Sequence, residues 1–264
     1  MEQLIVIKIG GNVIDNTPVL EKFLSDLCTI DGPKILVHGG GKLATELSTS
    51  LGIETKMVEG RRITDDATIR IVTMTYAGFI NKTIVAKINA RGGNAIGLSG
   101  VDASLIPAAK RPVKDIDYGW VGDILPGRIN TNLLSALLSA GLTPVIAPIS
   151  GTAAGHLLNI NADTIAQSLA VAMSRLYQTT LLYCFEKNGV LSDVTDEDSV
   201  IPLIRVSEAA ELKANGTIGS GMIPKIDNAC QAVSDGVAQV IIGRSDDIIS
   251  LANNKHGYGT RISH

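Results

Sequence analysis

The stretch Leu4-Ile-Val-Ile-Lys-Ile-Gly-Gly11 opens this 264-residue chain with a β-branched run that ends in two glycines. Such a short apolar run, stopped by glycines, predicts a buried strand of a parallel sheet. The glycines let a ligand approach main-chain N–H groups, and Lys8 adds a positive charge at the strand end. This strand end therefore suits a phosphate.

A second stretch, Ile35-Leu-Val-His-Gly-Gly-Gly41, repeats the pattern, and a helical pattern follows it. Open α/β sheets bind ligands at the carboxyl ends of their strands, where the N-termini of helices favour anions. Two such turns predict one anionic substrate held between them. The chain has no Walker-type phosphate loop, and no Gly-x-Gly-x-x-Gly follows a strand, which disfavours both the ordinary P-loop and the dinucleotide-binding class.

Strand-like and helix-like segments alternate along the whole chain, which predicts an α/β protein with a mostly parallel sheet covered by helices. The glycine- and proline-rich region 99–130 predicts a β-hairpin or flap, and a soft boundary falls near 174–179. The expected strands cover 4–9, 34–38, 94–98, 143–147, 180–185 and 238–242, with helices at 131–140 and 164–174 and a last short strand within 253–264.

Composition excludes several classes of protein. The net charge of −3 and the aromatic fraction of 3% disfavour nucleic-acid binding. Without a visible signal peptide or an apolar stretch of bilayer length, we expect no membrane association and a cytoplasmic location. The three cysteines are far apart and fit reduced thiols. The four histidines lack metal-ligand spacing, so no metal site is expected in the chain itself.

Three further segments carry polar groups suited to a substrate. Glu59-Gly-Arg-Arg-Ile-Thr-Asp65 offers two guanidinium groups, which can bind a carboxylate or simply form a surface ion pair with Glu59 or Asp65. Asn159-Ile-Asn-Ala-Asp163 contains an expected helix cap at Asn161 or Asp163. Its other polar groups favour a binding site.

The third segment, Gly216-Thr-Ile-Gly-Ser-Gly-Met-Ile-Pro-Lys225, is a glycine-rich loop that leads into a helix with a lysine in its first turn. A cation there opposes the helix dipole unless an anion, such as a nucleotide phosphate, compensates it. A flexible loop with an exposed lysine is the alternative.

Taken together, the segments resemble the amino acid kinase family, and within it the members that phosphorylate N-acyl-glutamates. The match runs nearly end to end, and its order and spacing are specific. It rests on Lys8-Ile-Gly-Gly, His38-Gly-Gly-Gly, Gly60-Arg-Arg-Ile-Thr, Asn81-Lys82, Gly97-Leu-Ser-Gly, Asn159-Ile-Asn-Ala-Asp163, Gly221-Met-Ile-Pro-Lys225 and Gly259-Thr-Arg-Ile.

The resemblance implies a three-layer αβα sandwich with an open, mostly parallel central sheet, and a homodimer. An N-lobe of about 1–175 would bind the acyl amino acid and form the dimer, and a C-lobe of about 176–264 would bind ATP. Mg²⁺ would be held mainly by the nucleotide phosphates. The implied activity is ATP-dependent phosphorylation of the γ-carboxylate of N-acetyl-L-glutamate in arginine biosynthesis.

The resemblance also assigns roles. Lys8 and Lys225 would stabilise the migrating phosphoryl group, and Asp163 would orient these lysines. The acceptor carboxylate is already ionised, with an ordinary pKa of about 4.3, so no general base is needed. Substrate contacts are expected from Gly11, Gly40, Gly41, Arg62 and Asn159, and nucleotide contacts from Gly10, Asn188, Gly189, Gly219, Gly221 and Met222.

Departures from the family pattern leave alternatives open. Arg61 stands where relatives often carry leucine, so it is either a surface arginine or a partner for a second carboxylate, as in N-succinyl-L-glutamate. The turn after residue 185 is also unusual. Another kinase of the same fold, or a catalytically inactive ligand-binding or regulatory member, are rival functions. Because Lys8 lies so near the start, we expect a dimer without the N-terminal helix of arginine-inhibited hexamers.

Overall fold

The computed structural model describes residues 1–58, 61–193, 195–218 and 222–264. The chain forms two compact units: the first combines Met1–Ile35 with Ala166–His264, and the second is Leu36–Ile165. These units differ from the expected lobes because β1 (Gln3–Ile9) pairs in parallel with β11 (Gln178–Phe185), which joins the first residues to the C-terminal part. The assignment of substrates and dimer contacts to lobes 1–175 and 176–264 stays a prediction.

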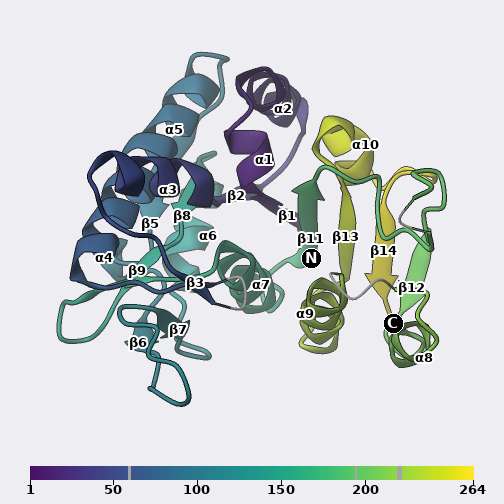
Figure 1. Cartoon of the computed structure of the whole chain (residues 1–264). Helices are drawn as coiled ribbons and strands as arrows, with labels where there is room; N and C mark the ends of the chain where they lie inside the picture. Colours follow the sequence, from purple (N-terminus) through teal and green to yellow (C-terminus); the bar gives the residue numbers. More distant parts are fainter. Residues whose placement is uncertain (59–60, 194, 219–221) are drawn as a thin grey trace. The chain divides into compact units, whose positions relative to one another are not determined.

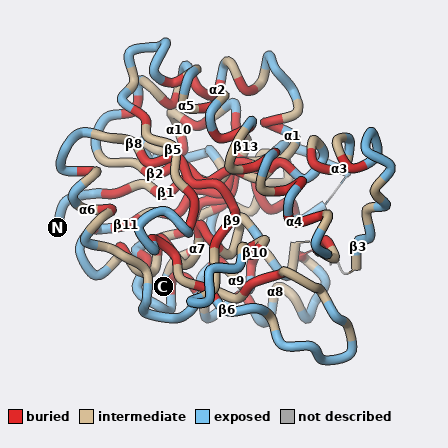
Figure 2. Tube along the Cα trace, turned by 90° about the vertical axis from the view of Figure 1, so that its left-hand side faces the viewer, coloured by how far each residue is buried: buried red, intermediate tan, exposed pale blue. Residues whose placement is uncertain are grey.

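The first unit is built on five strands in the order β12-β14-β13-β11-β1, parallel except between β13 and β14. Four of the seven residues of β1 are fully buried, as expected of a strand covered on both faces. Figure 2 shows such strand residues among the buried segments of the chain. The remaining strands are β13 (Gln239–Arg244), β14 (Thr260–Ser263) and β12 (Leu203–Arg205).

Helices cover this sheet on both sides. The helix α9 (Ile223–Ser234) lies against β13 and β14, and its buried residues Ile226, Ala229 and Val233 recur at helical spacing. The helix α10 (Ile248–Ala252) contacts β11, β13 and α2, and Figure 1 shows it at the opposite end of these strands from α9. The others are α1 (Gly11–Ile14), α2 (Thr17–Thr29), α8 (Ala209–Ala214) and the short η3 (Ser245–Asp247).

The second unit contains three parallel strands, with β8 (Thr143–Ala147) between β2 (Lys34–His38) and β5 (Ala95–Ser99). Residues 36–38 of β2 belong to this unit. The helices are α3 (Gly41–Ser50), α4 (Asp66–Val72), α5 (Asn81–Asn89), α6 (Thr131–Ser139) and the short η2 (Asp102–Ser104). The helix α7 (Ala162–Met173) crosses from the second unit into the first.

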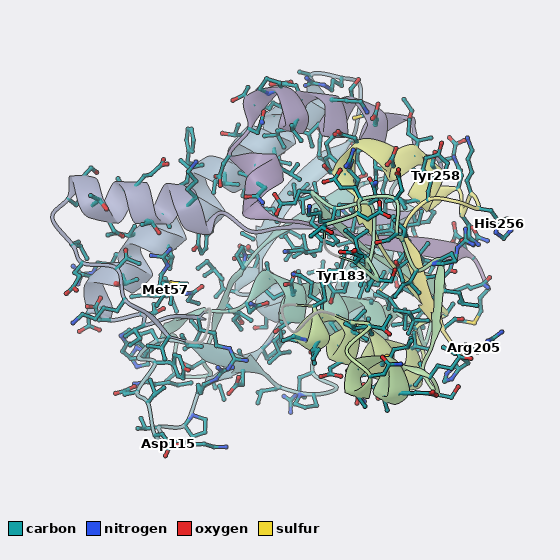
Figure 3. The ribbon with its side chains drawn as sticks, turned by 45° about the vertical axis from the view of Figure 1, so that its right-hand side comes forward. Met57, Asp115, Tyr183, Arg205, His256 and Tyr258 are labelled. Carbon is teal, nitrogen blue, oxygen red and sulfur yellow. The ribbon has the colours of Figure 1, made fainter. Side chains whose placement is uncertain are left out.

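Three small hairpins decorate the second unit. The expected flap is confirmed as β6 (Ala108–Lys110) paired with β7 (Gly122–Ile124), and Figure 3 shows Asp115 at the outer tip of their connection. Two hairpins were not anticipated: β3 (Met57–Val58) with β4 (Arg61–Arg62), and β9 (Ile149–Gly151) with β10 (Leu157–Asn159). A π-helix, η1 (Thr73–Ile80), also joins α4 to α5 without a break.

The predicted fold class is confirmed: strands and helices alternate, and helices flank a mostly parallel sheet. The predicted strands and the helices 131–140 and 164–174 appear within a few residues of their expected bounds. Among the described residues, no helix has the length and apolar character needed to cross a bilayer.

Candidate active site

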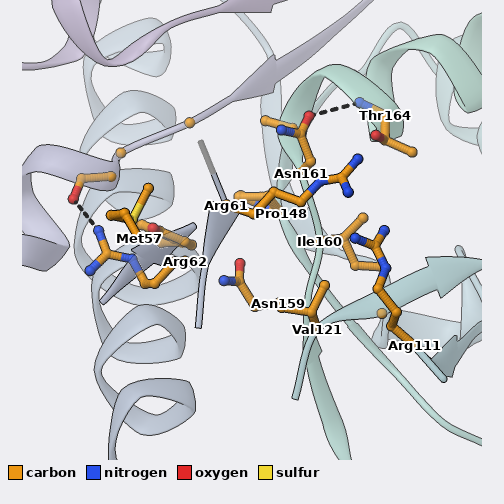
Figure 4. A pocket seen from close by; sticks show the side chains of 16 residues that line it. Met57, Arg61, Arg62, Arg111, Val121, Pro148, Asn159, Ile160, Asn161 and Thr164 are labelled. Carbon is orange, nitrogen blue, oxygen red and sulfur yellow. Dashed lines mark hydrogen bonds between the residues drawn. The ribbon is translucent and has the colours of Figure 1, made fainter. Parts of the chain in front are cut away.

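A pocket of about 210 Å³ opens at the carboxyl ends of β2 and β8 in the second unit. Figure 4 shows that three arginine side chains and Asn159 border it, and we call it the arginine pocket. Four of the predicted substrate contacts, Gly40, Gly41, Arg62 and Asn159, line this one pocket, while Gly11 does not. The remaining lining residues are Gly39, Met57, Arg61, Tyr76, Arg111, Val121, Gly122, Pro148, Ile160, Asn161, Ala162 and Thr164.

The glycine turn after β2 is fixed by its surroundings. Gly40 has a φ of +144°, and a Cβ there would lie 2.2 Å from Cδ1 of Ile80, so only glycine fits. The helix α3 begins at the next residue, and within the described part of the chain no side chain caps it. Its first N–H groups are therefore available to an anion, as the sequence predicts.

A buried histidine supports this turn from behind. His38 is fully buried, and its Nδ1 donates to the carbonyl of Gly39 over 2.8 Å. Its Nε2 accepts from Nδ2 of Asn81 over 3.2 Å, and the same amide donates to the carbonyl of Val145 over 2.9 Å. Burial lowers the pKa of His38 from 6.5 to about 4, so the ring is neutral near pH 7.

Arg62 is the most deeply buried of the three arginines that line the pocket. It is only 7% exposed, and its guanidinium donates to the carbonyl of Gly41 and the hydroxyl of Thr45, both over 2.8 Å. A third bond, 3.1 Å long, reaches the hydroxyl of Thr55. All three acceptors are neutral oxygens, so a carboxylate from a ligand would supply the compensating charge.

A buried threonine connects the arginine to the asparagine. Thr64 is fully buried, and its hydroxyl donates to the carbonyl of Arg62 and accepts from Nδ2 of Asn159, both over 3.0 Å. The main-chain N–H of Asn159 donates to the carbonyl of Trp120 over 2.8 Å, and that of Trp120 donates to the carbonyl of Thr64 over 2.6 Å. Trp120 of the flap is therefore hydrogen-bonded to both Thr64 and Asn159.

The capping explanation is correct for Asn161. Its Oδ1 accepts from the N–H groups of Asp163 and Thr164, over 2.8 and 3.1 Å, at the start of α7. Asp163 stands in the first turn of α7, and it is not among the described residues that line the arginine pocket. Its role in orienting the lysines stays a prediction.

Sequence reasoning missed Arg111 in this site. It comes from the flap, lines the pocket, and donates to Oδ1 of Asp123 through Nη2 over 2.5 Å and through Nε over 3.1 Å. These hydrogen bonds raise the pKa of Arg111 further above its ordinary value. A single basic residue in a hairpin gives no periodic signal, so only the return of the flap to the pocket reveals it.

The first unit carries a second pocket, of about 460 Å³, which we call the lysine pocket. Both predicted catalytic lysines, Lys8 and Lys225, line it. A Cβ on Gly10 would lie 3.7 Å from Nζ of Lys8, which places this ammonium over the glycine turn. Nζ of Lys225 lies 5.9 Å from the ring centroid of Phe185, and Lys225 stands in the first turn of α9. Two lysines from opposite ends of the chain thus line the same pocket.

The predicted nucleotide contacts divide into three groups. Gly10, Gly189 and Met222 line the lysine pocket, as does Gly11, which was expected to contact the acceptor. Asn188 is not among the described lining residues, and its amide donates to the carbonyl of Glu197 over 3.0 Å. Gly219 and Gly221 lie outside the described residues. The other lining residues are Asn12, Val13, Phe185, Glu186, Lys187 and Leu191.

The unusual turn after β11 brings a carboxylate into the lysine pocket. Glu186 accepts from Nδ2 of Asn12 over 2.7 Å, and both residues line the pocket. Beyond it, Glu197 pairs with Lys187 over 3.2 Å and with Arg244 over 3.3 Å. These ion pairs hold the pKa of Glu197 below its ordinary value. Ion pairs therefore anchor this turn.

A parallel α/β fold with two pockets lined by cations is suited to binding small anions. Comparison with known proteins then places it: the chain belongs to the amino acid kinase family, whose model matches residues 3–244. The resemblance read from the motifs is confirmed.

Curated relatives match the chain nearly from end to end. A protein named acetylglutamate kinase from Cytophaga hutchinsonii is 50% identical over 263 residues, which cover 99% of each chain. Another of that name, from Phocaeicola vulgatus, is 51% identical over 91% of this chain and 93% of its own. Among solved structures, an N-acetylglutamate synthase from Neisseria gonorrhoeae superimposes with a TM-score of 0.83 at 20% identity, over 100% of this chain and 59% of that one. This last similarity concerns the fold alone.

Proposed function

We propose that the protein transfers the γ-phosphoryl group of ATP to the γ-carboxylate of N-acetyl-L-glutamate, forming N-acetyl-L-glutamyl 5-phosphate in arginine biosynthesis. The near full-length similarity to proteins named acetylglutamate kinase supports this activity. The observation that carries it in the structure is the buried guanidinium of Arg62, which faces neutral acceptors in the pocket that also contains Asn159.

The acceptor would be bound by groups of the second unit. Arg62 would bind the α-carboxylate through charge-assisted hydrogen bonds, and the amide of Asn159 would bind a polar group of the substrate. The N–H groups of the turn at Gly40 and Gly41 would face an oxygen of the substrate. The γ-carboxylate is ionised at neutral pH, so it attacks phosphorus without a base.

Phosphoryl transfer spreads negative charge over the equatorial oxygens, and the lysine pocket would stabilise this charge. Lys8 and Lys225 would stabilise that charge, with the glycine turn at Gly10 and Gly11 supplying N–H groups. Among the described residues, no three His, Cys, Asp or Glu side chains cluster to hold a metal. A Mg²⁺ ion bound mainly by the nucleotide phosphates would neutralise charge there.

A homodimer completes the proposal. The surface formed by α3 and η1 supports it, because Met74 is 54% exposed and Phe79 is 65% exposed there. Large apolar side chains this exposed on adjacent turns are typical of surfaces that become buried against another chain.

A coupled ADP-release assay tests the kinase proposal, with N-acetyl-L-glutamate, aspartate and UMP offered as acceptors. We expect turnover with the acyl-glutamate, and we expect Lys8→Ala and Lys225→Ala each to lower kcat by about 10²-fold or more with little change in the acceptor KM. Lys255→Ala, an exposed lysine of the same unit, is the matched control. Near-normal kcat in both variants would contradict the assigned roles.

The inactive binding member of the same fold remains the alternative function. Full inertness with every acceptor, together with tight binding of the acyl-glutamate in calorimetry, would favour this alternative over the kinase.

A further inference from the structure

The arginine pocket contains more positive charge than N-acetyl-L-glutamate needs. Three guanidinium groups line it, from Arg61, Arg62 and Arg111. The acetylated substrate has two carboxylates, and the γ-carboxylate is the one that receives the phosphoryl group. Once Arg62 binds the α-carboxylate, two guanidinium groups remain for the rest of the ligand.

These remaining cations lie apart from Arg62. In Figure 4 the guanidinium of Arg62 turns toward the glycine turn, whereas those of Arg61 and Arg111 extend to the other side of the pocket, near Asn161 and Ile160. The pocket therefore has two cationic ends. An acyl-glutamate whose α-carboxylate occupies the first end directs its acyl group elsewhere in the same pocket.

Among the residues that the structure describes, the second end has an excess of one positive charge. Arg111 is neutralised by Asp123, to which it donates three hydrogen bonds and with which it forms an ion pair. Among the described residues, none forms an ion pair or a side-chain hydrogen bond with Arg61. A methyl group placed here would remove water from a guanidinium and return no hydrogen bond, whereas a carboxylate would accept two.

We infer that the pocket prefers N-acyl-L-glutamates whose acyl group itself ends in a carboxylate, which Arg61 binds with help from Arg111. This inference rests on the proposed function, because it assumes that the pocket receives an N-acyl-L-glutamate. Val121, Pro148 and Ile160 line the pocket as well and would pack against the methylene groups of such an acyl chain.

Three acceptors separate charge from length: N-acetyl-, N-succinyl- and N-butyryl-L-glutamate. Succinyl and butyryl have the same number of carbons, and only succinyl ends in a carboxylate. We expect kcat/KM for the succinyl compound to exceed that for the butyryl compound by about 10- to 100-fold, the range of one charge-assisted contact. The ratio should fall as salt concentration rises, since Arg61 is exposed.

Substitution of Arg61 gives the second arm. We expect Arg61→Leu to remove about 10-fold or more of the preference for the succinyl over the butyryl compound, through a loss of kcat/KM for the succinyl compound. Arg61→Lys should restore part of the preference. Arg70→Leu, an exposed arginine on α4, is the control that should change neither value.

Calorimetric titration of the same three compounds, without nucleotide, distinguishes the two proposals. Preferential binding of N-succinyl-L-glutamate that Arg61→Leu abolishes, without turnover of any acceptor, would support the inference and contradict the kinase proposal. Turnover with equal kcat/KM for the succinyl and butyryl compounds, unaffected by Arg61→Leu, would overturn the inference and leave the kinase proposal intact.

Discussion

Acidification should unfold this protein partly through one buried imidazole. His38 donates to Gly39 through Nδ1, and its Nε2 accepts from the amide of Asn81. Burial lowers the pKa of His38 to about 4. Protonation of Nε2 would also direct two donors at each other. The unfolded chain keeps the ordinary pKa of 6.5.

The sign and size of the effect follow from proton linkage. Between pH 6.5 and pH 4 the unfolded state binds the proton that the folded state refuses, so the free energy of unfolding falls as pH falls. At pH 5 the imidazole contributes a loss of about 2 kcal/mol relative to pH 8, and the loss levels off at about 3 kcal/mol below pH 4. Above pH 6.5 the contribution vanishes because both states are neutral.

The assay is denaturant unfolding of the wild type and of His38→Gln at pH 8, 7, 6 and 5. Glutamine keeps a donor and an acceptor but does not titrate, so the difference between the two proteins cancels the carboxylates that titrate in both. We expect this difference to shift by about 2 kcal/mol in favour of the variant between pH 8 and pH 5.

A difference that stays constant to within about 0.5 kcal/mol would refute the reasoning. If the variant does not fold, an NMR titration of the His38 imidazole in the wild type replaces the comparison. A pKa near 6.5 for this imidazole would also refute the reasoning.

Two further substitutions test the geometry of the arginine pocket. Thr64→Val should lower the free energy of unfolding by about 1–3 kcal/mol and raise the acceptor KM, because it removes the hydrogen-bond partner of the Arg62 carbonyl and of the Asn159 amide. Thr64→Ser keeps the hydroxyl and should restore both values, which denaturant unfolding and steady-state kinetics measure. Gly40→Ala should abolish acceptor binding in calorimetry, because its Cβ would lie 2.2 Å from the side chain of Ile80. Gly52→Ala is the control, since Gly52 has a φ of +70° but its Cβ would meet no atom within 4 Å. This control should lower the free energy of unfolding by only about 1–2 kcal/mol and leave acceptor binding unchanged.

Local sequence signals predicted most of the fold. The run Leu4–Gly11 became a buried strand and a glycine turn, since apolar periodicity and glycine spacing act over a few residues. The lysine in the first turn of α9 was predicted for the same reason, because Pro224 fixes where that helix begins. The π-helix and the hairpin β9–β10 were missed because their formation depends on packing rather than on local propensity.

The sequence by itself therefore determined the parallel α/β architecture, the glycine turns, and the identity of the lysines and of Arg62, since each is written in a short stretch. Only the tertiary structure decided that Arg111 returns to the arginine pocket and that Thr64 binds Asn159, which lies 95 positions further along the chain. The pairing of β1 with β11, which places residue 3 beside residue 178, is of the same kind. The physical reason is that such contacts depend on how distant segments pack, and their free energy leaves no mark in the local pattern of residues.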